Sequence, residues 1–498
     1  MTPFNITAID FAWLPLCPLA VVALAAIIVL LVGVRVRDDE SEGLGALTLA
    51  LLAVAFIFTL GLFGRSGIAF AGALSLDNFA AIFELLILMS SAVVILMSIE
   101  YVPVMGLSAA EYYALILFAT LGMMLMAAGA DLIVIFIGFE IMSISVYVLA
   151  GFLRRNLKSN EAALKYFMLG AFSTAFLLYG IALVYGATGT IKLGPISAAL
   201  SGPMAANPLL LSGLGLMLVG FGFKVAAVPF HMWTPDAYEG APTPVTAFMA
   251  VGVKLGAFAG FIRIFMVHLG PVSIHWTAVL WVIAALTMTL GNLAALMQTN
   301  IKRMLAYSAI AHAGYLLVGM TAAGSQAGGA IIYYLLGYAF TNLGAFAVVI
   351  ALERRGVEGD LITDYRGLAT RHPVLAAAMA LFLFSLTGIP PLAGFVGKFY
   401  IFSAALNAGL VGLVIIAVIN SVVSAYYYVS VIVAMYVLEG GVEFGPLDSR
   451  PALIAALSVA AIATVLIGIY PNPYMSGALH AFNSAFGATL PRTALMIP

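Results

Sequence analysis

Five ionisable side chains lie within long apolar segments, where a charge is costly. Glu140 lies in FIGFEIMSISVYVLAG, Lys224 in GFGFKVAAVPFHMW and Lys254 in FMAVGVKLGAFAG. Lys398 follows two prolines in LTGIPPLAGFVGKFYIF, and Lys165 lies about one turn inside its segment. A charged group at bilayer depth costs at least about 2.5–3.5 kcal/mol, so such residues normally face a polar interior and take part in function. The chemistry that they indicate is proton transfer inside a membrane.

The composition places these residues in a membrane protein that crosses the bilayer many times. The chain has 498 residues, of which 64% are hydrophobic and 8% charged, and its 20 basic residues nearly balance 21 acidic ones. This balance, without a basic face, argues against nucleic-acid binding. Cys17 is the single cysteine, and neither GxGxxG nor GxxxxGK[ST] occurs. We therefore expect no disulfide framework, metal site, iron–sulfur cluster or nucleotide site on this chain.

Apolar segments of about 20 residues predict an all-α fold with about fourteen transmembrane helices. The predicted helices cover residues 13–34, 43–63, 77–99, 111–129, 131–152, 162–187, 208–237, 243–268, 275–298, 303–322, 327–352, 373–405, 409–437 and 451–470. Twelve Lys and Arg residues fall in the odd-numbered connections and three on the opposite side. The odd connections are therefore predicted to be cytoplasmic, with both termini on the outer side.

The segments form two related units. NEAALKYFMLGAF precedes a long helix interrupted at Pro229, and NIKRMLAYSAIAHAGY precedes one interrupted at Pro390 and Pro391. Each unit has about five helices, so the two units must lie inverted in the membrane. We predict a three-helix segment (1–110), a first repeat (111–270), an inverted second repeat (271–437) and a final helix with an amphipathic outer tail (438–498).

Glu140 and Lys224 suggest a mechanism. Ser143 and Tyr147 follow Glu140 at i+3 and i+7, which makes a narrow polar stripe. The carboxyl either pins two helices together or titrates and acts on a neighbour. Pro229 frees backbone polarity next to Lys224, where water can gather. We hypothesise that Lys224 carries a proton under the control of Glu140, and that Lys398 repeats the arrangement.

Other polar residues extend the predicted path, although each has a simpler interpretation. Lys254 lies mid-helix, where it can link the repeats, whereas Lys165 can instead reach the cytoplasmic surface and Arg263 can reach the outer surface or form an ion pair. The uncharged polar residues that either hold helices together or support a chain of water molecules are His312, Ser308, Tyr315, Asn342, Asn420 and Ser424.

Four motifs carry a resemblance over nearly the whole chain. The stretches 164–190, 223–248, 301–320 and 386–402, which include FKVAAVPFHMWTPDAYEGAPTPVTAF and IKRMLAYSAIAHAGYLLVGM, resemble the subunit N family of bacterial NADH:quinone oxidoreductase, respiratory complex I. The resemblance implies a fourteen-helix, antiporter-like subunit that carries protons. The functional residues of the family fall on Glu140, Lys165, Lys224, Lys254 and Lys398.

The resemblance also implies a setting for the chain. NADH, FMN, the iron–sulfur clusters and quinone are expected on other subunits, so this chain contributes to an enzyme without holding a redox cofactor. The implied partners are membrane-arm subunits of the M, K, J and L types, the peripheral redox arm and the lipid of a bacterial inner membrane. Two alternatives share part of the pattern: a subunit of a cation/proton antiporter without redox activity, and the equivalent subunit of a photosynthetic-type complex.

Overall fold

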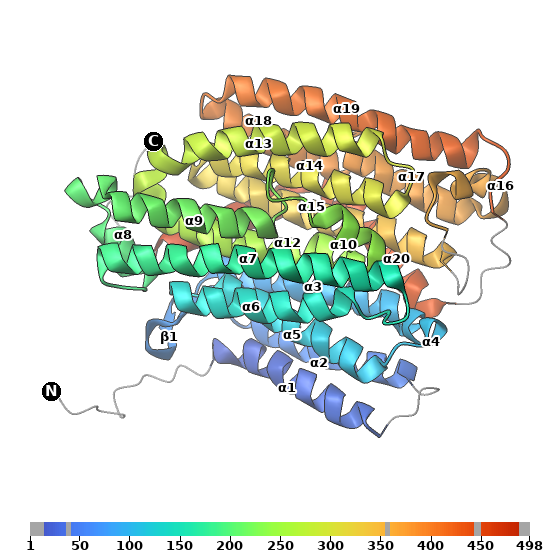
Figure 1. The fold of residues 1–498 in the computed structure, drawn as a ribbon, viewed down its shortest axis with the longest axis horizontal. Helices are drawn as coiled ribbons and strands as arrows, with labels where there is room; N and C mark the ends of the chain where they lie inside the picture. Colours follow the sequence, from blue (N-terminus) through green and yellow to red (C-terminus); the bar gives the residue numbers. More distant parts are fainter. Residues whose placement is uncertain (1–13, 36–40, 354–358, 443–449, 488–498) are drawn as a thin grey trace.

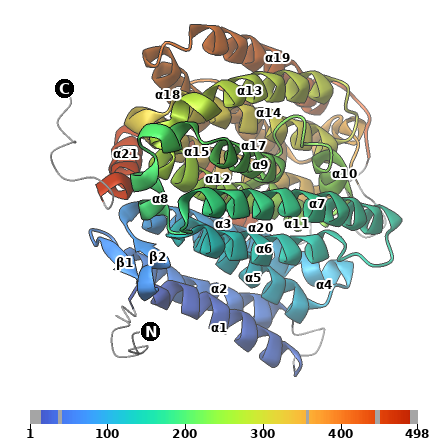
Figure 2. The ribbon, with the colours of Figure 1, turned by 60° about the vertical axis from the view of Figure 1, so that its left-hand side comes forward.

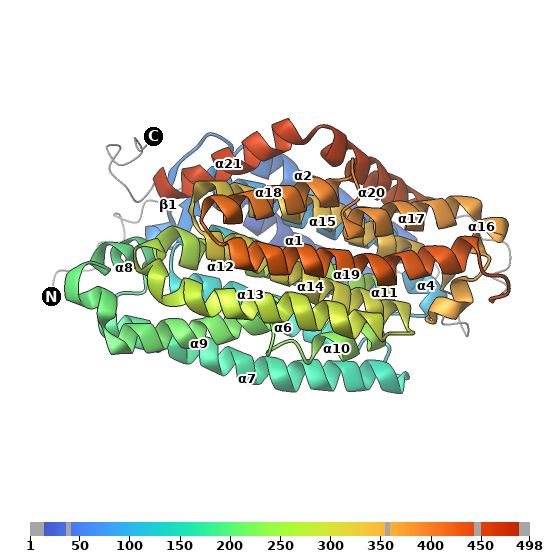
Figure 3. The same ribbon diagram turned by 90° about the horizontal axis from the view of Figure 1, so that it is seen from above.

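The computed structural model describes residues 14–35, 41–353, 359–442 and 450–487 of the chain. It is a bundle of helices, and the axes of its long helices lie roughly parallel to one another (Figures 1 and 3). Except at its two ends, a helix pairs its backbone polar groups internally, which is what a membrane interior requires. Within the described residues, twelve helical segments are long and apolar enough to cross a membrane. The chain is therefore a membrane protein with many spans.

Eleven of these segments each contain one long α-helix. They are α1 (Leu16–Gly33), α2 (Ser41–Leu60), α3 (Asn78–Ile99), α5 (Ala109–Ala128), α6 (Leu132–Ala150), α7 (Leu157–Thr188), α13 (Ser273–Leu296), α14 (Ile301–Ala322), α15 (Gly324–Leu352), α19 (Val411–Tyr436) and α20 (Pro451–Ile469). Shorter helices lie at the ends of the bundle: α4 (Tyr101–Met105), α8 (Leu193–Ala199), α16 (Leu368–Arg371) and α21 (Pro471–Gly487).

The twelfth segment, Thr243–His268, is buried along its whole length and changes its helical winding twice. It consists of α11 (Thr243–Phe248), a π-helical turn (Met249–Val253), α12 (Lys254–Phe261) and a second π-helical turn (Ile262–His268). Lys254 thus follows directly on a π turn, a local winding that often marks a functional site. The apolar pattern of the sequence gave no indication of these turns.

Two further predicted spans are interrupted. The first consists of α9 (Pro208–Lys224) and α10 (Thr234–Gly240), and the second of α17 (Pro373–Thr387) and α18 (Ala393–Asn407). Proline lacks the amide hydrogen that continues a helix. The first half-helix nevertheless ends at Lys224, well before Pro229, because Ala226 adopts a left-handed conformation with φ of 61°.

The ends of the bundle are held by contacts between distant parts of the chain. The α1–α2 pair lies at one side of the molecule and α18 with α19 at the other (Figures 1 and 2). The short hairpin of β1 (Gly67–Ala69) and β2 (Leu74–Leu76), which the sequence reading missed, precedes α3. The Ser484 hydroxyl on α21 accepts a hydrogen bond of 3.2 Å from the Phe79 amide in the first turn of α3. The tail helix therefore packs at the edge where α3 begins.

Candidate functional site

Lys224 is the last residue of α9 and only 2% exposed. Its ammonium donates a hydrogen bond of 3.2 Å to the Tyr166 hydroxyl. The rings of Phe139, Tyr147 and Tyr166 surround it at 5.1–5.2 Å from the ammonium to each ring centroid. Ring faces attract a cation but do not neutralise it. Lys224 is therefore held in an aromatic cage that can accept a charged or a neutral amine.

Glu140 lies near this cage without a direct bond to the lysine. The Thr174 hydroxyl on α7 donates a hydrogen bond of 2.8 Å to the Glu140 carboxylate, which is half-buried. Its neighbour in the chain, Phe139, is one of the three caging rings. The predicted proximity to Lys224 is thus seen, but the two groups form no ion pair in the described structure. An influence of Glu140 on Lys224 must act through space or through intervening groups.

Lys165 lies apart from the buried lysines. Its side chain is 44% exposed and pairs with Glu161 at 2.6 Å and with Asp236 at 2.7 Å. Asp236 also receives Arg303 of α14 at 2.6 Å, and the same guanidinium nitrogen contacts Glu239 at 2.9 Å. This network ties α7 and α14 to α10, the second half of the first broken helix. The sequence placed Arg303 at the start of the predicted helix 303–322 and did not identify it or Asp236 as part of the site.

Lys254 occupies the middle of the fully buried span and is 3% exposed. Its ammonium donates a hydrogen bond of 2.5 Å to the carbonyl oxygen of Ala309 on α14. The Tyr338 ring of α15 lies 5.0 Å from the ammonium. Lys254 therefore contacts both α14 and α15, the second and third long helices of the predicted second repeat.

His312 of α14 lies at the centre of a hydrogen-bonded cluster. Its Nδ1 atom is 2.5 Å from the Tyr334 hydroxyl and its Nε2 atom 3.1 Å from the Tyr428 hydroxyl. The Tyr428 hydroxyl also bonds to Ser308. The Tyr338 ring packs 5.2 Å from the imidazole and also faces Lys254. The structure thus brings His312 and Ser308 together with the lysine.

Lys398 is bound differently from Lys224. Its ammonium is 4% exposed and donates hydrogen bonds to the carbonyls of Leu386 and Thr387 at 3.0 and 2.8 Å and to the Ser421 hydroxyl at 2.9 Å. These carbonyls end α17, where the helix dipole favours a cation. Lys224 precedes its helix break and Lys398 follows its own. As the sequence indicates, Lys398 lies in the second half of its broken helix, so the two lysines share their association with a helix break but not the side of the break.

Of the remaining predicted polar residues, Asn420 and Tyr315 share hydrogen bonds to Asn292, whereas Ser424 and Asn342 do not bond to Asn292. The Asn292 side-chain amide donates hydrogen bonds to the side-chain oxygen of Asn420 at 3.2 Å and to the Tyr315 hydroxyl at 3.4 Å. The Tyr315 ring lies 4.9 Å from the Lys398 ammonium. The Ser424 hydroxyl donates a hydrogen bond of 2.6 Å to the backbone carbonyl of Ser421 in its own helix. Asn342 is fully buried, and no described residue forms a hydrogen bond with its amide group.

The sequence did not identify Asp77 and Glu353, two acidic residues that accept hydrogen bonds outside this path. Arg263 is 1% exposed and bonds Asp77 through two nitrogens, each at 2.9 Å, so the paired alternative holds. Glu353, at the end of α15, accepts hydrogen bonds from Thr243 at 2.5 Å and from Tyr101 at 3.1 Å. Burial raises the pKa of Glu353, and the nearby charge of Lys302 opposes that shift. No periodicity marks either pairing, because the partners are more than 100 residues apart.

The described residues contain no cluster of three or more His, Cys, Asp or Glu side chains that could hold a metal ion. The path residues carry amine, imidazole, hydroxyl and carboxyl groups, all of which can transfer protons.

Comparison with known proteins supplies the family. Residues 128–424, which include every predicted path residue, match the family described as NADH:quinone oxidoreductase/Mrp antiporter, TM. The NADH-quinone oxidoreductase subunit N of Trichlorobacter lovleyi is 47% identical over 93% of this chain and 96% of its own length. The chain belongs to the subunit N family of NADH-quinone oxidoreductases. The predicted resemblance is confirmed.

Further members of the family agree. The subunit N of Chloroflexus aggregans is 47% identical over 92% of this chain and 94% of its own length. A chain in the structure of respiratory complex I from Thermus thermophilus with bound aureothin superimposes with a TM-score of 0.77 at 35% identity, covering 93% of this chain and all of that one. The predicted all-α, antiporter-like membrane fold is thereby confirmed. The count of fourteen helices and the inverted repeats stay predictions.

Proposed function

We propose that this chain translocates protons as the subunit N of an NADH:quinone oxidoreductase, with Lys224, Lys254 and Lys398 as the proton carriers. The proposal rests on one observation: the three lysines are buried and form no ion pairs with carboxylates of the described residues. Each is 2–4% exposed. A buried ammonium without a counter-ion is costly, so the charged and neutral amines differ little enough in free energy to exchange during a cycle.

The contacts between the lysines support a continuous route through the second half of the chain. Lys254 faces the Tyr338 ring, which packs against His312. A cavity of about 10 Å³, enough for about one water molecule, is lined by His312, Tyr338, Ser385 and Leu386 among others. The Leu386 carbonyl accepts a hydrogen bond from Lys398. A proton can therefore pass from the Lys254 region to Lys398 over short steps between polar groups.

Glu140 and Lys165 have regulatory roles in this proposal. Glu140 changes the electrostatic potential at Lys224 when it gains or loses a proton. Lys165 shares Asp236 with Arg303, so a change in its pairing alters the restraint on α10. Pro229, Pro390 and Pro391 keep both broken helices open next to the lysines. The divisions at residues 110, 270 and 437 are part of the same proposal.

The surroundings of the chain are also proposed. Its partners are other membrane-arm subunits, of the M, K, J and L types, and the peripheral redox arm. NADH, FMN, iron–sulfur clusters and quinone are held by those subunits. The membrane is a bacterial inner membrane, with both termini on the periplasmic side. The excess of Lys and Arg in the odd connections supports this orientation.

The experiment compares proton uptake with NADH oxidation in sealed vesicles that contain the assembled complex. In the Glu140→Gln variant the amide oxygen still accepts the Thr174 hydrogen bond, but the charge is lost. We expect fewer protons per NADH and an unchanged subunit content. A wild-type ratio would contradict the role of Glu140. Sodium-dependent proton exchange by the isolated chain, without NADH, would favour the antiporter alternative.

A further inference from the structure

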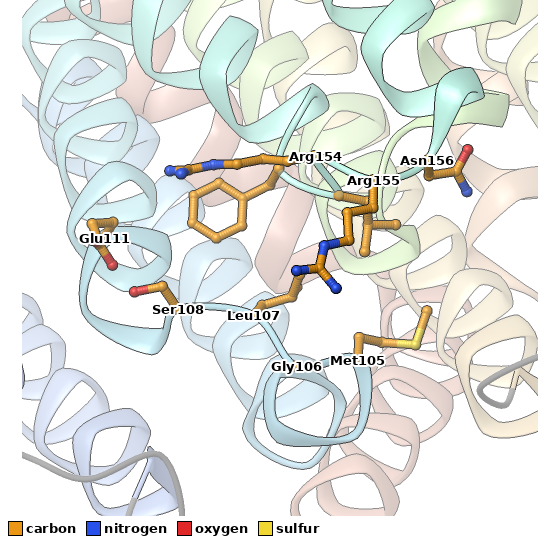
Figure 4. Close-up of a pocket in the computed structure, with 10 residues that line it drawn as sticks. Met105, Gly106, Leu107, Ser108, Glu111, Arg154, Arg155 and Asn156 are labelled. Atoms are coloured by element: carbon orange, nitrogen blue, oxygen red, sulfur yellow. The ribbon is translucent and has the colours of Figure 1, made fainter.

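A large cavity lies at one edge of the bundle, away from the proposed proton path. It has a volume of about 630 Å³ and opens between the α4–α5 connection and the α6–α7 connection (Figure 4). Its lining residues are Met105, Gly106, Leu107, Ser108, Glu111, Phe152, Leu153, Arg154, Arg155 and Asn156. The cavity therefore combines an apolar surface with three charged side chains.

The two arginines of this cavity have no side-chain partner among the residues that the structure describes. No described residue forms a hydrogen bond or an ion pair with either guanidinium group, whereas Arg263 and Arg303 are both paired. Figure 4 shows Arg154 extending toward the side of Glu111 and Arg155 extending toward Leu107. Two adjacent guanidinium groups with free donors suit an anion that can accept several hydrogen bonds, such as a phosphate diester.

The level of the cavity along the helices matches the headgroup region of a bilayer. The membrane-crossing helix α6 ends at Ala150, α7 begins at Leu157 and α5 begins at Ala109. The cavity lies between these ends, on the side that the distribution of Lys and Arg predicts to be cytoplasmic. Basic pockets between helix ends on that side are suited to anionic lipid headgroups.

We propose that this cavity binds an acidic phospholipid with a hydroxyl-bearing headgroup, of the phosphatidylglycerol type. Arg154 and Arg155 hold the phosphate diester. Phe152, Leu107 and Met105 supply apolar surface to the glycerol backbone and the start of the acyl chains. Glu111 on the other wall repels a second negative charge but accepts hydrogen bonds from headgroup hydroxyls. The pair of walls thus selects a singly charged headgroup that carries hydroxyl groups.

The lining distinguishes a lipid from an acidic segment of a neighbouring protein. A peptide carboxylate could pair with the arginines, but it would leave the apolar surface at headgroup level uncovered and would place its backbone next to Glu111. The inference is independent of the proposed proton transfer, because its test measures bound lipid and not proton movement.

The test uses the intact complex, depleted of lipid in mild detergent and examined by native mass spectrometry with added phosphatidylglycerol or phosphatidylcholine. The double variant Arg154→Gln, Arg155→Gln should bind phosphatidylglycerol at this site at least about tenfold more weakly than the wild type. At concentrations that fill the site in the wild type, the variant should therefore carry one fewer phosphatidylglycerol molecule. Arg65→Gln, an exposed arginine of the α2–β1 connection, is the matched control and should bind as the wild type does.

Glu111→Gln provides a second measurement. We expect it to reduce the preference for phosphatidylglycerol over phosphatidic acid, because a second negative charge is then tolerated. Equal phosphatidylglycerol binding by the wild type and the double variant would overturn the proposal. Loss of a neighbouring subunit from the double variant, with lipid binding unchanged, would show that an acidic protein segment occupies the cavity instead.

Discussion

Replacing Lys224 with methionine removes the ammonium but keeps an unbranched side chain at the end of α9. The variant loses one charged hydrogen bond to Tyr166, worth about 1.5–3 kcal/mol, and three ring contacts of about 0.5–2 kcal/mol each. It also relieves a buried ammonium that has no carboxylate partner, which costs several kcal/mol. Because these contributions nearly cancel, we expect the complex to assemble at close to the wild-type level.

Proton movement should respond quite differently from assembly. In sealed vesicles, the number of protons moved per NADH oxidised should fall in Lys224→Met. Lys192→Met, an exposed lysine whose ammonium contacts the Ala71 carbonyl, is the control and should keep the wild-type ratio. Subunit content on a native gel separates a loss of pumping from a loss of assembly.

The variant Lys224→Arg tests whether residue 224 must release its proton. Arginine keeps the positive charge but does not release its proton at any accessible pH. If Lys224 is a carrier, the arginine variant should fail as the methionine variant does. Full pumping by an assembled Lys224→Arg complex would mean that the residue acts as a fixed charge, and the proposed path would then be wrong at this position.

Three other changes test the surrounding structure. Asp236→Asn removes the carboxylate that Lys165 shares with Arg303. Because the side chains in these ion pairs are 28–44% exposed, each pair contributes only about 0.2–1 kcal/mol to stability, and the complex should still assemble. It should pump protons more slowly than the control variant Glu161→Gln, which removes only an ion pair with Lys165. Arg263→Met leaves the buried Asp77 without its counter-ion, at a cost of about 3–5 kcal/mol, so a native gel should show less assembled complex. Adding Asp77→Asn to the same chain should restore the amount of assembled complex, because asparagine keeps the N-cap of α3. Burial raises the pKa of Glu353 above its ordinary value of 4.5, so above pH 4.5 the folded state binds more protons than the unfolded state and stability falls as pH rises. In Glu353→Gln the thermal unfolding temperature should therefore depend less steeply on pH than in the wild type. An unchanged slope would exclude Glu353 as the source of the pH dependence.

Much of the architecture could be predicted because the membrane imposes a length and a composition on each span. The apolar segment 131–152 predicted α6 to within two residues at each end. The positions of Pro229 and Pro390 indicated which two spans are interrupted. Local winding was not accessible in this way: nothing in FMAVGVKLGAFAG distinguishes a regular α-helix from the π turn that precedes Lys254.

The candidate site was only partly predictable for a different reason. Intramembrane charges stand out individually, so Glu140, Lys224, Lys254 and Lys398 could be selected from the sequence. Their partners depend on helix packing. The Ala309 carbonyl that binds Lys254 belongs to a helix 55 positions later in the chain, and backbone carbonyls have no signature in a sequence. The aromatic cage of Lys224 likewise combines rings from α6 and α7 that only the tertiary structure brings together.

The contrast between Arg263 and the three lysines explains why burial alone does not identify a proton carrier. Arg263 is 1% exposed and the lysines 2–4%, so desolvation is nearly the same for all four. Arginine cannot become neutral, and a buried arginine therefore requires a carboxylate, which Asp77 supplies through two hydrogen bonds of 2.9 Å. Lysine can release its proton, so carbonyls, hydroxyls and ring faces are sufficient partners. An unpaired arginine in the position of any of the three lysines would be a permanent uncompensated charge, whereas an ion-paired lysine would hold its proton too firmly to pass it on.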